Sequence, residues 1–203
     1  MPNSKKIINH TNGHDPKLYH LKYKICISGA AETSSYTPEA LLKVEELGGL
    51  IAQRGFILVT GATTGAPYWA AKGAKEAGGF VIGISPAYSK IQHVKTYHLP
   101  LDYHDLIIYT GFGYSGRNLL LTRSSDAVMS VCGRIGTLNE FTDAFEDGKP
   151  QGVLMGLGGT TDMIPEILER AGRGHGKAVF DTDPKTLLDK VVEMMVDDEQ
   201  EVA

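Results

Sequence analysis

The sequence predicts an α/β fold, a Rossmann-like open doubly wound parallel sheet of about seven strands with helices on both faces. Short β-branched and apolar runs alternate along the chain with longer helical patterns. The strand-like runs are apolar on both faces, as expected when helices cover both sides of a parallel sheet. Right-handed crossovers between such strands give an open doubly wound sheet.

The predicted elements follow one another in order. Strand-like runs occupy residues 23–30, 56–62, 80–86, 105–111, 127–133, 152–159 and 178–183. Helical patterns occupy residues 38–55, 67–78, 117–125, 137–148, 161–172 and 184–198. Two helix starts carry an N-cap residue followed by proline, at Thr37-Pro38 and Asp183-Pro184.

One domain is expected, over residues 22–196. Residues 1–21 are polar, contain Asn12-Gly13 and Asp15-Pro16, and show no sustained periodicity, so we expect a loosely ordered N-terminal extension. Residues 197–203 are expected to form a frayed acidic end. With 203 residues, 42% of them hydrophobic and 22% charged, the chain is long enough to bury a sizeable core without disulfides or metals.

Composition and charge exclude several classes of function. The net charge is -4, and the 20 basic and 24 acidic residues are mixed along the chain, which argues against nucleic acid or an anionic membrane as a partner. No apolar stretch approaches the length of about 18 residues that a membrane span needs, and the N-terminus lacks a signal-peptide core. Cys26 and Cys132 lie in apolar runs and are expected to be buried reduced thiols. We therefore expect a cytoplasmic protein.

No metal site is expected. His10 and His14 have helical spacing, but the Asn-Gly between them breaks the helix that would align them.

The composition has one anomaly, because 24 of the 203 residues are glycine. In a doubly wound sheet, ligands bind beyond the carboxyl ends of the strands, where glycine allows close approach of the backbone and helix N-termini offer free N–H groups. The strand-to-helix turns here are rich in small and hydroxylated residues. Our candidate ligand-binding or phosphate-binding residues are Gly29, Gly61, Gly65, Gly113, Gly133, Arg134, Gly136 and Thr137.

Gly111, Gly113 and Gly116 form a G-x-G-x-x-G pattern between a predicted strand and a helix. The pattern follows the fourth strand rather than the first, and the next strand ends without an acid to hold a ribose 2′-hydroxyl. Arg134 could instead meet a 2′-phosphate, so an NADP-binding enzyme is a weaker alternative. We favour a phosphate-approaching loop without a dinucleotide.

Arg117 opens the predicted helix 117–125, where a cation at the positive end of the macrodipole typically costs about 0.3–1 kcal/mol. Such a placement invites an anion, and the alternative is an arginine on a solvated face. Gly136, Thr137 and Glu140 follow the next strand. Thr137 and Glu140 have the spacing of a capping box, while the functional alternative places a phosphate on Gly136 and Thr137 with Glu140 facing the same crevice. Both alternatives stay open.

The run GFGYSGRNLLLTRSSDAVMSVCGRIGTLNEFTDAFEDGKPQGVLMGL resembles the signature of the Lonely Guy (LOG) superfamily, often labelled "possible lysine decarboxylase", and of its molybdenum-cofactor-carrier-like branch. The hallmark of this superfamily is PGGxGTxxE preceded by an arginine. Here the hallmark stands at 132–140, with Arg117 upstream. The likeness extends over about residues 22–190. Cys132 replaces the proline of the hallmark, and Arg134 replaces its second glycine.

The resemblance implies a nucleoside 5′-monophosphate phosphoribohydrolase, which cleaves the N-glycosidic bond to give free base and ribose 5-phosphate. Arg117 and Glu140 would be the catalytic pair, Gly136 and Thr137 would hold the 5′-phosphate, and no cofactor would be required. Carrier-like members imply the alternative, a non-hydrolytic protein that binds or carries a nucleotide or the molybdenum cofactor. The ligand in either case is a phosphorylated, nucleotide-like small molecule. The resemblance also implies a homodimer or higher oligomer, and no lysine context supports lysine decarboxylation.

Overall fold

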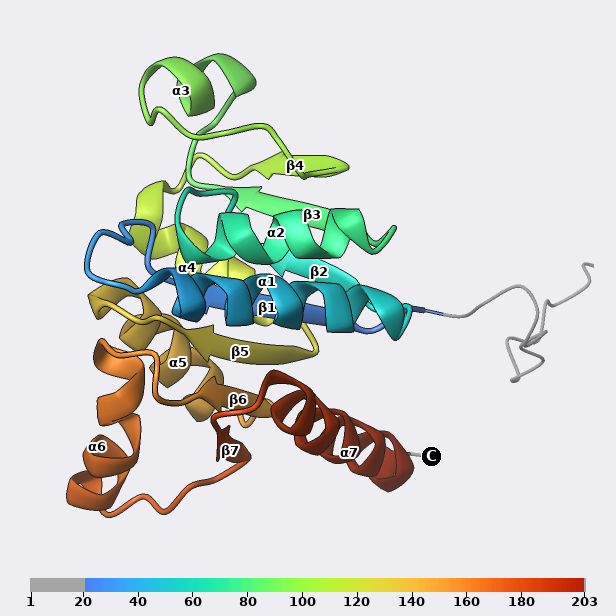
Figure 1. Ribbon diagram of the computed structural model, residues 1–203, viewed down its shortest axis with the longest axis vertical. Coiled ribbons are helices and arrows are strands. Elements are labelled where there is room, and N and C mark those ends of the chain that lie inside the picture. Colours follow the sequence, from blue (N-terminus) through green and yellow to red (C-terminus); the bar gives the residue numbers. More distant parts are fainter. Residues whose placement is uncertain (1–20, 203) are drawn as a thin grey trace, which may run out of the picture.

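The computed structural model describes the backbone of residues 21–202 and the side chains of residues 21–197. Seven strands form one parallel sheet in the order β4-β3-β2-β1-β5-β6-β7 (Figure 1), which confirms the predicted fold class. The strands are β1 Lys24–Gly29, β2 Ile57–Thr60, β3 Phe80–Ser85, β4 Leu106–Tyr109, β5 Ala127–Val131, β6 Gln151–Leu154 and β7 Ala178–Asp181. The predicted extension at 1–21 lies, except for Leu21, outside the described residues.

Helices cover both faces of the sheet. They are α1 Pro38–Gln53, α2 Ala66–Glu76, α3 Lys90–Lys95, α4 Gly113–Arg123, α5 Ile135–Glu146, the 3-10 helix η1 Thr160–Met163, α6 Ile164–Ala171 and α7 Pro184–Val202. Figure 1 shows α1, α2 and α7 in front of the sheet and α4 and α5 behind it. None of the helices in the described part of the chain has the length and hydropathy of a membrane span.

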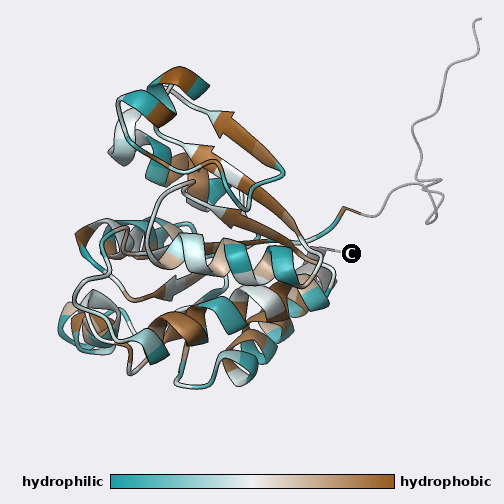
Figure 2. Cartoon of the chain, turned by 45° about the horizontal axis from the view of Figure 1, so that its top comes forward, coloured by the Kyte–Doolittle hydropathy of each residue, from teal (hydrophilic) through white to brown (hydrophobic). Residues whose placement is uncertain are grey.

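Alternation along β1 shows how the sheet separates two cores. Ile25 and Ile27 pack with buried residues of α1, α2 and α7, whereas Cys26 packs with Leu121 of α4 on the other face. Both faces are therefore apolar, because each is covered by helices. In Figure 2 the strands are largely hydrophobic and the helices carry residues of both kinds.

The two predicted N-caps form as expected. The side chain of Thr37 accepts a hydrogen bond from the N–H of Ala40 at 3.2 Å, and Asp183 accepts one from the N–H of Thr186 at 2.7 Å. Each cap satisfies an N–H group that has no partner within its helix.

Several predicted boundaries are corrected. Helix α4 begins at Gly113, so Arg117 lies in its second turn and does not open the helix. Helix α5 begins at Ile135 with Arg134 as its N-cap, which places Thr137 and Glu140 inside the helix. The capping box is therefore wrong, because its threonine would have to be the N-cap. Helix α7 continues through Val202, so residues 197–202 are helical although a frayed end was predicted there. Glutamate and glutamine favour helix continuation.

Helix α3 belongs to an excursion, residues 86–105, that sequence patterns did not reveal. Two histidines attach it to the carboxyl ends of strands: His93 lies 2.8 Å from the hydroxyl of Ser85, and His104 lies 2.8 Å from that of Thr60. The second ring nitrogen of each histidine lies within 2.9 Å of a backbone carbonyl oxygen. In each ring the nitrogen next to the carbonyl oxygen donates to it, and the other nitrogen is hydrogen-bonded to the hydroxyl.

The strand order places a crevice at the centre of the sheet. The chain runs outward from β1 to β4, crosses back through α4, and continues outward from β5 to β7. The connections after β1 and β5 therefore diverge at their carboxyl ends, which is where ligands bind in this class of fold.

Candidate functional site

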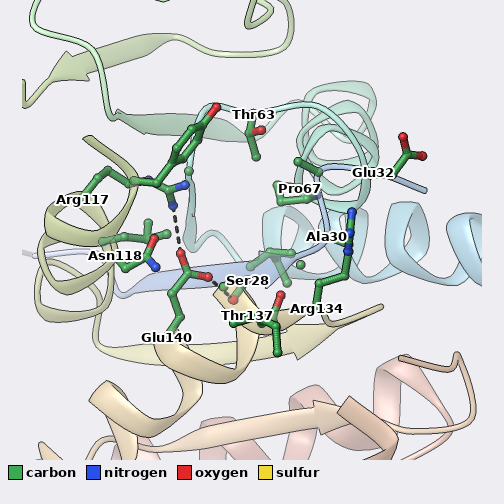
Figure 3. A pocket seen from close by; sticks show the side chains of 18 residues that line it. Ser28, Ala30, Glu32, Thr63, Pro67, Arg117, Asn118, Arg134, Thr137 and Glu140 are labelled. Atoms are coloured by element: carbon green, nitrogen blue, oxygen red, sulfur yellow. Dashed lines mark hydrogen bonds and ion pairs between the residues drawn. The ribbon is translucent and has the colours of Figure 1, made fainter. Parts of the chain in front are cut away.

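A cavity of about 370 Å³ opens at the carboxyl end of β1. Its walls come from the turns after β1 and β2, the start of α2, and helices α4 and α5 (Figure 3). Seven of the ten sequence-predicted site residues line it: Gly29, Gly61, Arg117, Arg134, Gly136, Thr137 and Glu140. The structure thus brings the proposed catalytic pair and the proposed phosphate turn into one cavity.

Glu140 and Arg117 form a buried ion pair in this cavity. Nη1 of Arg117 donates to Oε1 of Glu140 at 2.9 Å, and the two side chains are only 7% and 6% exposed. The alternative of a solvated arginine is therefore wrong. Arg117 belongs to α4 and Glu140 to α5, so the ion pair links the two helices that cover one face of the sheet (Figure 3).

Two further donors hold the Glu140 carboxylate. The hydroxyl of Ser28, at the end of β1, donates to Oε2. With its nitrogen turned toward Glu140, the amide of Asn118 donates to Oε1 at 2.8 Å and to the carbonyl of Tyr114 at 2.9 Å. Strand β1 and helix α4 therefore fix the orientation of a side chain on α5.

Burial raises the pKa of the Glu140 carboxyl above its ordinary value, while the positive charge of Arg117 and the hydrogen bond from Ser28 oppose this shift. A buried carboxyl whose pKa is raised, beside a cation in a cavity, is the kind of group that performs acid–base or electrostatic catalysis. Nε of Arg117 is buried without a hydrogen-bond partner among the described residues. This guanidinium therefore keeps a donor for a ligand.

Gly61 is needed for Arg117 to reach Glu140. A Cβ atom at Gly61 would lie 2.3 Å from Nη1 and 2.7 Å from Cζ of Arg117, closer than any real carbon contact. The guanidinium passes directly over the backbone at this turn. A side chain here would displace the catalytic candidate, so this glycine acts through Arg117.

The N-terminus of α5 faces the cavity without a cap. No described group accepts from the N–H groups of Ile135, Gly136 and Thr137, and the N-cap side chain makes no capping hydrogen bond. The space beside Gly136 is open, with no atom within 4 Å of where its Cβ would be. Free N–H groups and the positive end of the helix dipole bind anions.

A second observation points to a ligand in the same cavity. Thr63 lines the cavity and is 95% buried, and its hydroxyl has no hydrogen-bond partner in the described part of the chain. Buried hydroxyl groups are nearly always paired, so an unpaired one at a cavity wall is suited to a ligand.

Arg134 stands at the rim of the cavity, exposed to solvent, and does not fill it. Its guanidinium makes no ion pair or hydrogen bond with any described residue. Glu32 lies on the same rim, where a hydrogen bond from the N–H of Ser34, and more weakly the charge of Arg134, hold the pKa of its carboxyl below the ordinary value. The rim thus offers a free cation next to the open helix end.

Three predicted residues do not line the cavity. Gly65 caps α2 and packs against the carbonyl of Ala30, Gly113 begins α4, and Gly133 pairs with Gly159 in the turn after β6. They build the walls behind the cavity. The other two glycines of the G-x-G-x-x-G pattern, Gly111 and Gly116, also lie outside the cavity lining, and of this turn only Tyr114 lines the cavity.

Sequence reasoning missed four polar lining residues: Ser28, Glu32, Thr63 and Asn118. Ser28 had a usable signal, because it ends the first strand and precedes a glycine at the predicted crevice. Asn118 adjoins Arg117, but helix packing decides which neighbour of Arg117 points inward.

The two thiols behave as predicted. Cys26 and Cys132 are free and buried, and burial raises the pKa of Cys132 to about 12. A thiol with this pKa is protonated at neutral pH and is a poor nucleophile. Within the described residues, no three metal-ligating side chains form a cluster.

Comparison with known proteins agrees with the fold. An uncharacterized protein of Archaeoglobus fulgidus is 35% identical over 126 residues, which cover 62% of this chain and 76% of the relative. The molybdenum cofactor binding protein from Rippkaea orientalis is 29% identical, with a TM-score of 0.72 over 87% of this chain and 99% of that chain. The molybdenum cofactor carrier protein of Chlamydomonas reinhardtii is 28% identical, with a TM-score of 0.67 over the same shares.

A more distant structure shares the fold alone. DNA processing protein A from Helicobacter pylori is 19% identical, with a TM-score of 0.59 over 85% of this chain and 81% of that chain. The resemblance to the LOG superfamily is confirmed by a family match that covers most of the chain. Residues 22–188 match the SLOG cluster4 family, and the chain therefore belongs to that family.

Proposed function

We propose that this protein is a nucleoside 5′-monophosphate phosphoribohydrolase. One observation carries the proposal: a buried Arg117–Glu140 pair, held by Ser28, lies in the same cavity as an uncapped helix N-terminus. The helix end supplies an anion site, and the carboxyl supplies a group for the reacting centre.

The phosphate would bind at the first turn of α5. The N–H groups of Ile135, Gly136 and Thr137 are free donors, and Arg134 adds a guanidinium from the rim. An arginine offers a planar fork that matches phosphate oxygens. This arrangement binds a dianionic monophosphate without a metal ion.

The ribose would lie beside Glu140. When the bond between C1′ and the base nitrogen breaks, positive charge develops on the ribosyl group, and its electron pair leaves with the base. The Glu140 carboxylate offsets that charge and orients the attacking water, whose oxygen bonds to C1′ while one of its protons passes to the departing base nitrogen. The free Nε of Arg117 anchors a ligand oxygen.

Incubation with AMP, GMP, CMP and UMP, followed by chromatography, tests the proposal by release of free base. Glu140→Ala should abolish release. Glu146→Ala is a matched control, because Glu146 lies on the same helix but is exposed and paired with Arg173. If the wild-type protein releases no more base than Glu140→Ala from any of these nucleotides, the proposal is wrong.

A second candidate is a non-hydrolytic binding or carrier protein for a nucleotide or a molybdenum-cofactor-type ligand. Arg134 favours it, because the hydrolase hallmark has glycine at this position. The names of the Rippkaea and Chlamydomonas proteins favour it as well. A phosphorylated ligand that raises the melting temperature without being cleaved, or that co-purifies in mass spectra, would support this candidate over the first.

We also propose that the protein forms a homodimer or higher oligomer through the outer side of α4. Phe112, Leu119 and Leu120 are between 37% and 68% exposed there. Exposed apolar groups gathered on one side of a helix are typical of an interface. A monomeric mass in light scattering at micromolar concentration would contradict this.

A further inference from the structure

A groove between α4 and α5 continues from the cavity. The two hollows share Tyr114, Asn118, Ile135 and Gly136 as lining residues, so a ligand can extend from one into the other without leaving the surface. Beyond these shared residues, the groove runs along α5 past Asn139 and Asp143. The proposed function places no part of the ligand there.

The mouth of the groove has an aromatic and an aliphatic wall. Tyr114 of α4 is 49% exposed and Ile135 of α5 is 76% exposed. The ring of Tyr114 packs edge-on against Tyr97, with ring centroids 5.4 Å apart, so the excursion around α3 supports it. Such walls fit a flat ring system, because aromatic surfaces gain from stacking and apolar contact.

The polar side of the groove is formed by Asn139 and Asp143 of α5 together with Asn118 of α4. The amides of Asn118 and Asn139 lie 2.9 Å apart, and Asp143 stands one turn further along. The Asp143 carboxylate forms no ion pair or hydrogen bond within the described residues, and burial raises the pKa of its carboxyl, helped by the nearby charge of Asp147. An unpaired carboxylate accepts N–H donors and offers none when ionised.

We infer that this groove is the subsite for the heterocycle of the ligand, and that Asp143 selects heterocycles with adjacent N–H donors on one edge. Guanine and pterins share this edge, a ring N–H beside an amino group. Adenine presents an amino group beside a ring nitrogen that only accepts, which would face the carboxylate unfavourably. The inference rests on the proposed function, which supplies the phosphate site.

The order of groups along α5 agrees with this placement. The free N–H groups lie at residues 135–137, the catalytic candidate at Glu140, and the carboxylate at Asp143. At 1.5 Å per residue, Gly136 and Asp143 are about 10 Å apart along the helix axis. Phosphate, sugar and heterocycle follow one another in the same order in a 5′-nucleotide.

Calorimetric titration with GMP, AMP and ribose 5-phosphate tests the inference. The full chain carries Glu140→Gln throughout, which removes the proposed catalytic carboxylate so that the nucleotides are not cleaved during the titration. Ribose 5-phosphate lacks a heterocycle and reports on the phosphate site alone. We expect GMP to bind at least about tenfold more tightly than AMP. Hydrogen bonds to a charged group are strong, and AMP can donate only one of the two hydrogen bonds that GMP donates to the Asp143 carboxylate. Asp143→Asn should weaken GMP by about tenfold and leave ribose 5-phosphate unchanged. Glu146→Gln is the matched control, since Glu146 lies on the same helix outside the groove and is paired with Arg173.

The outcomes separate the inference from the function on which it rests. If ribose 5-phosphate binds but GMP and AMP bind equally, or Asp143→Asn changes nothing, the groove is not this subsite and the phosphate site still stands. If neither ribose 5-phosphate nor any nucleotide binds, the proposed function fails and the inference fails with it. A phosphorylated pterin is titrated in parallel to decide which of the two heterocycles the groove prefers. The preferred heterocycle is the one whose phosphorylated form binds more tightly and loses affinity when Asp143 is replaced.

Discussion

Two neighbouring glycines of α1 should respond in opposite directions to the same substitution. Helices α1 and α2 cross so closely that a Cβ at Gly48 would lie 2.0 Å from the carbonyl oxygen of Ala70. Ordinary contacts begin at 3.4 Å, so Gly48→Ala requires α1 and α2 to separate by roughly 1.4 Å. A Cβ at Gly49 would meet only Gly73, with its carbonyl oxygen at 3.5 Å.

The size of the effect follows from these contacts. The clash at Gly48 is with backbone, which cannot rotate away, so we take the upper end of the usual overpacking cost, about 3 kcal/mol. The gain in helix propensity from glycine to alanine returns about 1 kcal/mol. Gly48→Ala should therefore lower the free energy of unfolding by about 2 kcal/mol, and Gly49→Ala should raise it by roughly 0.5–1 kcal/mol.

Thermal and urea unfolding, monitored by circular dichroism, measures the change in the free energy of unfolding for both variants. For a chain of this length, each kcal/mol corresponds to about 2–4 °C in Tm, so Gly48→Ala should melt roughly 4–8 °C below the wild type. If Gly48→Ala is as stable as Gly49→Ala, the helices are not held by this close contact and the reasoning is refuted.

Three further changes test the site and its supports. Gly61→Ala should lower kcat/KM for base release by about 100-fold, because it displaces the Arg117 guanidinium. The control Gly49→Ala should leave kcat/KM unchanged, and equal values for the two variants would contradict the role of Gly61 in positioning Arg117. Arg134→Gly should weaken phosphate binding by about tenfold and reduce its salt dependence, as measured by titration at two ionic strengths; unchanged affinity would remove Arg134 from the site. Burial holds the pKa of His104 below its ordinary value of 6.5, so the unfolded chain binds more protons and stability should fall as pH drops below about 6.5. In urea unfolding at pH 7.5 and pH 5.5, His104→Gln should show a smaller change in the free energy of unfolding between the two pH values than the wild type. An equal change in both proteins would contradict this role of His104.

The sequence patterns predicted the sheet because burial on both faces leaves a strong signal. Runs such as KICISG in β1 place apolar side chains on both faces of the sheet. The helices between the strands carry recognisable caps such as Thr37. Helix α3 left no such signal, because it is only six residues long and is attached through His93 and His104 rather than through an apolar stripe.

The site was predictable in its residues but not in its pairing. Turns rich in glycine pointed to the edge of the sheet at which the cavity lies, and the resemblance to the family hallmark pointed to Arg117 and Glu140. Arg117 was expected to open its helix, but α4 begins four residues earlier, and the burial of Arg117 against Glu140 follows from the packing of α4 against α5 rather than from the local sequence. Asn118 and Ser28 join the site through contacts with Glu140, which lies more than 20 and more than 100 residues away from them along the chain. Local sequence patterns do not encode such contacts.

Arg134 as the N-cap residue of α5 implies a conflict between folding stability and binding. Aspartate or serine at an N-cap usually stabilises a helix by about 1 kcal/mol over a residue that cannot cap, so Arg134→Asp would strengthen the fold. The same carboxylate would occupy the N–H groups that a phosphate needs and would reverse the charge at the rim. An engineer who optimises this chain for thermal stability alone would therefore be led to close its own binding site, and residue 134 should be held fixed in any such effort.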